Sequence, residues 1–186
     1  MLFRSLALAR ARPGQLNYGS SGPGTNSHLA GVLLNLTAKV NIVHVPYKST
    51  PPMLIDLMSG QIEMTFPSIP GVVEHVKSGR MRMLAQTGTQ RSVTAPEVPT
   101  MAEAGLKGFF MNSGFGFVGP ANLPRAVIER VNAAMVRAVQ DPAVRKQIVD
   151  SGADPVAGSP DAHAAFNRNE VARWLKVAQT AGIQPE

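Results

Sequence analysis

The chain has 186 residues, of which 44% are hydrophobic and 16% charged, so it can form a packed core and is not a disordered polar chain. It contains no cysteine, which excludes disulfide scaffolds, zinc–thiolate sites and thiol catalysis. The formal net charge is +6, but no run of its 18 Lys and Arg residues is long enough to form a basic stripe, so nucleic acid is not an expected partner.

Residues 1–15 are rich in Ala, Leu and Arg and end near Pro13-Gly14, a sequence typical of a helix stop. A secretory signal peptide needs an uninterrupted apolar stretch and a cleavage site, and Arg4 and Arg10 interrupt the stretch here. We therefore predict a helix in this segment and no complete signal peptide. Elsewhere no apolar run approaches the roughly 18 residues of a membrane span, so no membrane-spanning segment is predicted.

Between residues 16 and 89, strand-like and helix-like patterns alternate. Such alternation predicts parallel strands with helices on both faces of one α/β unit. The predicted strands are 15–19, 40–45, 62–66 and 81–87, and the predicted helices are one capped by Thr25, one over 53–58 and one over 69–77. In the first helix, the apolar spacing predicts a buried face made of Leu29, Val32, Leu33 and Leu36.

The pattern changes after residue 89. Residues 90–99 are polar and contain Pro, which is typical of a crossing segment, and residues 111–118 form a Gly-rich strand candidate. Helices are then predicted to begin near Pro124, Asp141 and Pro160. For the last helix we expect Val171, Trp174, Leu175 and Ala178 to be buried and Arg173 and Lys176 to face solvent.

Residues 19–28 lie between the first predicted strand and its helix. Their small side chains let the backbone approach a ligand, and the helix directs its free N–H groups and positive dipole end at this loop. The loop is therefore a candidate site for a carboxylate or phosphate, with an ordinary capped turn as the alternative. Its candidate ligand-binding residues are Ser20, Ser21, Gly22, Gly24, Thr25 and His28. His28 either contacts the ligand or braces the turn.

Three familiar motifs are excluded in this loop. A nucleotide P-loop needs Lys where Thr25 stands, a dinucleotide fingerprint needs Gly where Ser27 stands, and a nucleophile elbow needs Gly where Pro23 stands. No two histidines share a metal-ligand spacing, and His44, inside an apolar strand, is interpreted as a core residue with its hydrogen bonds satisfied. We therefore predict no metal, no cofactor and no catalytic residue.

Two further loops follow predicted strands. Tyr47 and Ser49 come after the second strand, and Ser68 comes after the third. Because ligands of open α/β sheets bind at the carboxyl ends of the strands, we include these three residues as candidate ligand contacts. Plain connecting loops are the alternative.

These segments, in this order, resemble the Bug-type solute-binding receptors of tripartite tricarboxylate transporters. The resemblance covers about residues 6–186, and it rests on segments 16–20, 24–31, 43–48, 56–61, 78–85, 98–105, 115–120 and 172–174. It implies a type II periplasmic-binding-protein-like flytrap, in which two α/β domains enclose the ligand. It also implies reversible capture of a small di- or tricarboxylate in the periplasm, delivery to membrane transporter subunits, and no enzymatic activity.

The resemblance also implies an incomplete chain. The family has a second carboxylate loop, in a Pro-Gly-Gly-rich turn near its N-terminus, and this sequence has no such segment. Residues 1–15 would then be a residual helix, 16–89 a nearly complete ligand-binding domain, and 90–186 the crossing segment and C-terminal part of the other domain. We expect that incomplete part to expose apolar surface and to aggregate or oligomerise.

Two other functions stay open from the residues alone. One is an effector-sensing domain of a transcription regulator, which would need a helix-turn-helix ahead of it. The segment Arg4–Arg12 is too short for that motif. The other is a small serine hydrolase that uses Ser20 or Ser21 with His28.

Overall fold

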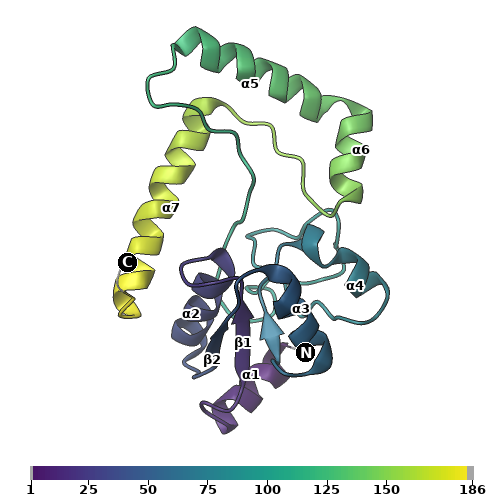
Figure 1. The fold of residues 1–186 in the computed structure, drawn as a ribbon, viewed down its shortest axis with the longest axis vertical. Helices are drawn as coiled ribbons and strands as arrows, with labels where there is room; N and C mark the ends of the chain where they lie inside the picture. Colours follow the sequence, from purple (N-terminus) through teal and green to yellow (C-terminus); the bar gives the residue numbers. More distant parts are fainter. Residues whose placement is uncertain (1, 184–186) are drawn as a thin grey trace.

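The computed structural model describes residues 2–183, in which a three-stranded parallel sheet with flanking helices is followed by three further helices (Figure 1). The strands are β1 (Asn17–Ser20), β2 (Val43–Pro46) and β3 (Met64–Thr65), in the order β2-β1-β3. The helices of this part are α1 (Leu2–Ala11), α2 (Asn26–Ala38), α3 (Thr50–Ser59), the 3-10 turn η1 (Ile69–Gly71) and α4 (Val73–Lys77). The later helices are α5 (Arg125–Gln140), α6 (Pro142–Asp150) and α7 (Pro160–Thr180).

The central strand β1 directs alternate residues to opposite faces of the sheet. Tyr18, paired with His44 and Met64, belongs to the core on the α2 side. Gly19 faces the other side, where an added Cβ would lie 2.7 Å from Met53 Cγ of α3. Helices therefore cover both faces of a parallel sheet, as the sequence predicts.

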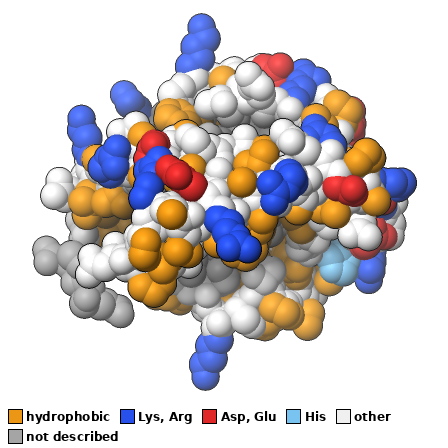
Figure 2. Space-filling view, turned by 90° about the horizontal axis from the view of Figure 1, so that it is seen from above, with side chains coloured by type: hydrophobic (Ala, Val, Ile, Leu, Met, Phe, Trp, Pro, Cys, Tyr) orange, Lys and Arg blue, Asp and Glu red, His pale blue; other side chains and the backbone are white. Residues whose placement is uncertain are grey.

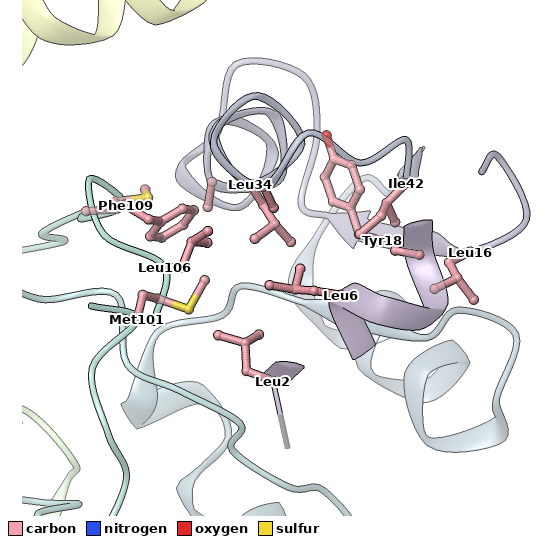
Figure 3. Packing of buried hydrophobic residues seen from close by; sticks show 13 residues of the cluster. Leu2, Leu6, Leu16, Tyr18, Leu34, Ile42, Met101, Leu106 and Phe109 are labelled. Carbon is pink, nitrogen blue, oxygen red and sulfur yellow. The ribbon is translucent and has the colours of Figure 1, made fainter. Parts of the chain in front are cut away.

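The larger core joins segments that are far apart in the chain (Figure 3). It contains Leu6 of α1, Tyr18 of β1 and Leu34 of α2, and residues 101–111 add Met101, Leu106, Phe109 and Met111. A smaller core of Met53, Leu54, Ile62 and Val72 lies under α3. Because residues 101–111 bury apolar side chains against the first unit, the predicted division at residue 89 does not coincide with a break in this core.

The predicted terminal helix forms, and it is an integral part of the first unit. Within α1, Leu2, Leu6 and Ala9 are buried in the larger core, and Arg10 donates a hydrogen bond to the Ala38 carbonyl at 3.1 Å. Burial of two leucines on one helix contributes on the order of 3–6 kcal/mol relative to leaving them exposed.

Helix α2 forms where the sequence predicts it, but it buries a different face. Its buried residues are Ser27, Ala30, Gly31, Leu34 and Ala38, whereas Leu36 is exposed and Leu29, Val32 and Leu33 are only half-buried. The reason is the ring of Tyr18, which lies directly against Gly31 and leaves room only for small side chains at the closest approach. The predicted leucine-rich face was therefore wrong.

Two predicted strands are absent from the described chain. Residues 81–87 contribute only an isolated bridge between Gln86 and Thr100. The buried Gln86 amide donates to the carbonyls of Ala95 and Val98 and accepts from Ser92 N–H, so this segment pairs with its own following loop rather than with the sheet. Residues 111–118 also form no strand, and all but Met111 are exposed.

Helices α5, α6 and α7 form an arch toward which the strands point (Figure 1). None of their residues, all of which the structure describes, is buried. The prediction for α7 was therefore wrong at Val171 and Leu175, which are 60% and 55% exposed, while Trp174 packs partly against the larger core. It was also wrong at Arg173, whose guanidinium stacks over the Phe110 ring at 4.0 Å and donates to the Phe110 carbonyl at 2.9 Å.

The arch is attached to the first unit at both ends. At one end, α7 contacts α2, and Arg173 holds Phe110. At the other end, Asp154 follows α6, and its carboxylate accepts hydrogen bonds from Ser92 Oγ at 2.8 Å and Val93 N–H at 3.0 Å. The buried Gly152 packs beside Ile69.

Replacing Asp154 by Ala is expected to loosen the α6 end of the arch without unfolding the sheet. The substitution removes two hydrogen bonds to a carboxylate at an exposed position, which corresponds to roughly 1 kcal/mol of local stability. Amide hydrogen exchange of Val93 should become severalfold faster. The matched control is Asp150→Ala, which removes only an exposed pair with Lys146; equal exchange rates at Val93 in the two variants would contradict the anchoring role.

Candidate functional site

The three candidate loops meet at one edge of the sheet. Each follows the carboxyl end of a strand, and all three strands are parallel. The first two loops touch directly, since Tyr47 N–H donates to the Ser20 carbonyl at 2.9 Å and the Tyr47 carbonyl lies close to Gly22. The position of the edge agrees with the sequence prediction.

The first loop turns sharply at two glycines. Gly22 has a φ of 130° and Gly24 a φ of 72°, which residues with a side chain rarely adopt. Thr25 then takes the extended N-cap conformation and α2 begins at Asn26. The turn therefore favours glycine at both positions.

Hydroxyl groups bind one another inside this loop. The buried Ser27 Oγ accepts from Ser21 N–H at 3.1 Å and lies 3.2 Å from Thr25 Oγ1, which donates to the Gly22 carbonyl at 2.6 Å. The sequence indicates Ser27 as one of the hydroxyl donors of this loop, together with Ser21 and Thr25, although it was not among the candidate ligand-binding residues.

Helix α2 begins without a side-chain cap. Thr25 makes no hydrogen bond to a helical N–H, and the first intrahelical bond runs from Leu29 N–H to the Thr25 carbonyl. Within residues 2–183, no partner is recorded for the N–H groups of Asn26, Ser27 and His28. These three N–H groups, with the positive end of the helix dipole, are suited to a carboxylate oxygen.

His28 braces the turn, which is one of the two roles that the sequence left open. Its Nδ1 accepts the Gly24 N–H at 3.1 Å, so the neutral ring carries its proton on Nε2 and can donate there. The ring stacks on His44 at 4.1 Å between centroids. Burial lowers the pKa of His28, and burial together with the nearby His28 lowers the pKa of His44 to about 4.

The Ser20 hydroxyl is buried, and hydrogen bonds within the protein occupy it. The residue is fully buried, and its Oγ lies 2.6 Å from His44 Nε2 and accepts Gly22 N–H at 3.2 Å. His44 is thus hydrogen-bonded, as the sequence predicts, but it is half-buried and belongs to neither core, so the prediction of a core residue was wrong. The Ser–His distance would suit a nucleophile and its base, but a hydroxyl that is buried and held by the loop cannot approach a substrate carbonyl.

The side chains of the remaining candidates lie at the edge without bonding to the first loop, although the backbone of Tyr47 does. Tyr47 Oη donates to Asp56 Oδ2 at 2.7 Å, and burial and this carboxylate raise the pKa of Tyr47 to about 12. Ser49 and Ser68 are exposed at the starts of α3 and η1 and make no side-chain cap. In the described chain, no hydrogen bond joins any of these side chains to residues 20–28.

In the described part of the chain, neither metal-ligating side chains nor surface charges form a second candidate site. No group of three or more His, Cys, Asp and Glu side chains within residues 2–183 could hold a metal ion. No described helix is both long and apolar enough to cross a membrane. Seen from the α5 end, the Lys and Arg side chains are scattered among apolar and neutral ones (Figure 2).

Comparison with known proteins identifies the family. The model described as tripartite tricarboxylate transporter family receptor matches residues 2–183. Protein BugT of Bordetella pertussis is 33% identical over 179 residues, covering 96% of this chain and 55% of that protein. The chain spans about half the length of BugT and of most other curated relatives it matches, and 92% of one shorter relative.

Two solved structures from Rhodopseudomonas palustris share the fold. Rpa4515 with adipate has a TM-score of 0.90 and 34% identity, and the match covers 100% of this chain and 62% of that chain. MatC with bound malate has a TM-score of 0.80 and 29% identity, over 95% of this chain and 61% of that chain. These likenesses confirm the predicted α/β, periplasmic-binding-protein-like fold class. Because the family match extends over nearly all of its residues, the chain belongs to the tripartite tricarboxylate transporter receptor family.

Proposed function

We propose that this chain contributes one side of a carboxylate-binding cleft in an extracytoplasmic solute-binding protein of a tripartite tricarboxylate-type transporter. The observation that carries the proposal is the first turn of α2, where the N–H groups of Asn26, Ser27 and His28 lack a partner in the described chain, beside a glycine turn at the carboxyl edge of the sheet. Two similar structures are described with adipate and malate, which are both dicarboxylates.

Each proposed contact has a distinct role. The N–H groups of α2 receive a carboxylate oxygen, and Thr25 and Ser27 keep the loop in shape through their shared hydroxyl contact. His28 Nε2 supplies a further donor at the same turn. Gly22 and Gly24 let the backbone turn, and Ser21 is bonded to Ser27. The buried Ser20 holds the loop in position through His44 and does not touch the ligand. Tyr47, Ser49 and Ser68 are proposed as outer contacts at the same edge.

The proposal extends to location and partners. Membership in a receptor family supports a periplasmic binding protein that passes its ligand to membrane transporter subunits and performs no reaction. The division into a ligand-binding unit before residue 90 and part of a second flytrap unit after it belongs to this proposal. The serine hydrolase that would use Ser20 or Ser21 with His28 is disfavoured, because neither hydroxyl bonds His28 in the described chain and Ser20 is buried. The family match lends no support to a transcription regulator.

Adipate and malate are expected to bind weakly, with dissociation constants of roughly 10 mM or above. A carboxylate at a single helix N-terminus gains only about 0.3–1 kcal/mol when exposed, so one side of a cleft cannot hold the ligand tightly. Titration followed by amide chemical shifts should move Asn26, Ser27 and His28 in a saturable way, and the neutral adipamide should not.

The variant Ser27→Ala should weaken this binding severalfold, because it removes the hydroxyl that holds Ser21 and Thr25. Ser59→Ala is the control, since that exposed hydroxyl only bonds its own helix. Absence of shifts at α2 at tens of millimolar dicarboxylate would refute the site. Micromolar binding would refute the idea that a second side of the cleft is needed.

A further inference from the structure

A second segment of the chain lies against the first turn of α2. Asn26, the first residue of α2, donates from its side-chain amide to Ser113 Oγ at 3.2 Å. Both residues are exposed, so a small ligand can reach them. Because they are 87 positions apart in the chain, the contact depends on the tertiary structure, and the sequence named neither residue as a candidate.

Ser113 is held in position from its N-terminal side. Met111 is buried in the larger core, and its N–H donates to the Thr87 carbonyl at 2.6 Å. Arg173 of α7 donates to the Phe110 carbonyl at 2.9 Å and stacks over the Phe110 ring. The backbone is therefore anchored two residues before Ser113, which lowers the entropy cost of using its hydroxyl as a ligand contact.

The Ser113 hydroxyl has a proton to donate. Asn26 Nδ2 occupies one acceptor position of the Ser113 oxygen, and within residues 2–183 no acceptor is recorded for the hydroxyl proton. In the same described range, the N–H groups of Asn26, Ser27 and His28 also have no recorded partner. Hydrogen-bond donors from two distant segments therefore lie at the same turn.

Space and charge beside this pair suit a carboxylate. An added Cβ on Gly24, two residues before the first residue of α2, or on Gly114 would have no atom within 4 Å, so both places are open. Residues 1–55 and 104–128 contain no Asp or Glu, so neither of the segments that meet here carries a negative charge. A carboxylate oxygen has more than one lone pair, so it can accept from a helix N–H and from a neighbouring hydroxyl together.

We propose that Ser113 is a further ligand contact, whose hydroxyl donates to a carboxylate bound at the first turn of α2, and that Asn26 positions this hydroxyl. The inference rests on the proposed function. It extends the ligand contacts from residues 19–28 to the segment that leads to α5, so a bound dicarboxylate joins the first unit to that segment.

Titration with adipate at constant ionic strength, followed by amide chemical shifts, tests the contact. In the wild type, Ser113 and Gly114 should shift together with residues 26–28 and give the same dissociation constant. Ser113→Ala should raise that constant roughly threefold or more, because a hydrogen bond to an ion is lost. Ser113→Thr keeps the hydroxyl and should stay within about twofold of the wild type. Ser151→Ala is the control, since that exposed hydroxyl bonds only the end of α6.

Asn26→Ala tests the positioning role. It should weaken adipate binding in the wild-type background and have a clearly smaller effect in the Ser113→Ala background, since the hydroxyl that it positions is gone. Both single variants should keep the urea midpoint of the wild type, because the bond that they remove is exposed. An equal effect of Asn26→Ala in both backgrounds would overturn the positioning role.

The outcomes also separate this inference from the proposed function. If adipate shifts residues 26–28 but binds Ser113→Ala as tightly as the wild type, the Ser113 contact is refuted and the proposed site stands. A loss in Ser113→Ala that Ser113→Thr does not restore would likewise refute the hydroxyl contact. If adipate shifts no amide at the start of α2, the inference and the proposed function fail together.

Discussion

Replacing Gly31 by Ala is expected to destabilise the protein by roughly 2–3 kcal/mol, although Ala is favoured over Gly inside a helix by about 1 kcal/mol. The added Cβ would overlap the ring of Tyr18, which is among the largest fully buried side chains. The ring cannot move freely, because it stacks on His44 and meets the Phe66 ring edge to face. In a chain of this length, the loss corresponds to a decrease in Tm of roughly 5–10 °C.

Urea denaturation of Gly31→Ala measures this loss, and Gly158→Ala is its control because Gly158 has open space around it and no positive φ. The control should stay within about 0.5 kcal/mol of the wild type. In a Tyr18→Leu background the cost of Gly31→Ala should fall by more than about 1 kcal/mol, since the overlapping ring atoms are gone. A cost that is the same in both backgrounds would show that the overlap is not its cause.

The stacked pair His28 and His44 is expected to make the free energy of unfolding fall in acid. Burial, and then the charge of nearby His28, lowers the pKa of His44 from 6.5 to about 4, so the unfolded chain takes up its proton at a higher pH than the folded chain. The stabilisation that arises from this pKa difference is fully present above pH 6.5. It decreases as the pH falls toward 4 and changes no further below that. A pKa shift of this size corresponds to a loss of at most about 3 kcal/mol in the free energy of unfolding. Partial solvent exposure of the two histidines reduces the expected loss to roughly 1–2 kcal/mol.

Urea denaturation at several pH values between 7.5 and 4 tests this expectation. The wild type should lose stability over that window, and His44→Gln should show a clearly smaller loss, although it is less stable at pH 7.5 because the stack is removed. His163→Gln, which removes an exposed histidine of α7, should keep the wild-type loss. If His44→Gln and the wild type lose the same free energy, the pair is not the origin of the acid sensitivity.

Local patterns predicted most of the elements correctly. The spacing of apolar residues and the turn residues predicted helices at the positions of α2, α3, α5, α6 and α7. These signals act within a few residues and so are visible in the sequence. The same patterns marked residues 19–28 as the candidate anion loop, since its glycines and hydroxyls adjoin a helix start. His44 could not be linked to Ser20 in this way, because the contact depends on the register between β1 and β2, which are separated by a whole helix.

Two predicted strands, residues 81–87 and 111–118, did not form, because neither segment pairs with the sheet. Residues 81–87 read as a strand, but the side chain of Gln86 binds the following loop and takes the segment out of the sheet. Residues 111–118 have the alternation of a strand, yet a strand exists only with a neighbour, and none lies beside it in the described chain.

The sequence alone indicated the α/β class through its alternating patterns, the family through its ordered resemblance, and the loop that we propose for a carboxylate through its short motif. Only the tertiary structure decided which face of α2 is buried, that Ser20 is closed off by His44, and that residues 101–111 complete the first core. The physical reason is the same in each case. Close packing and hydrogen bonds between distant segments select one arrangement among several that local preferences allow.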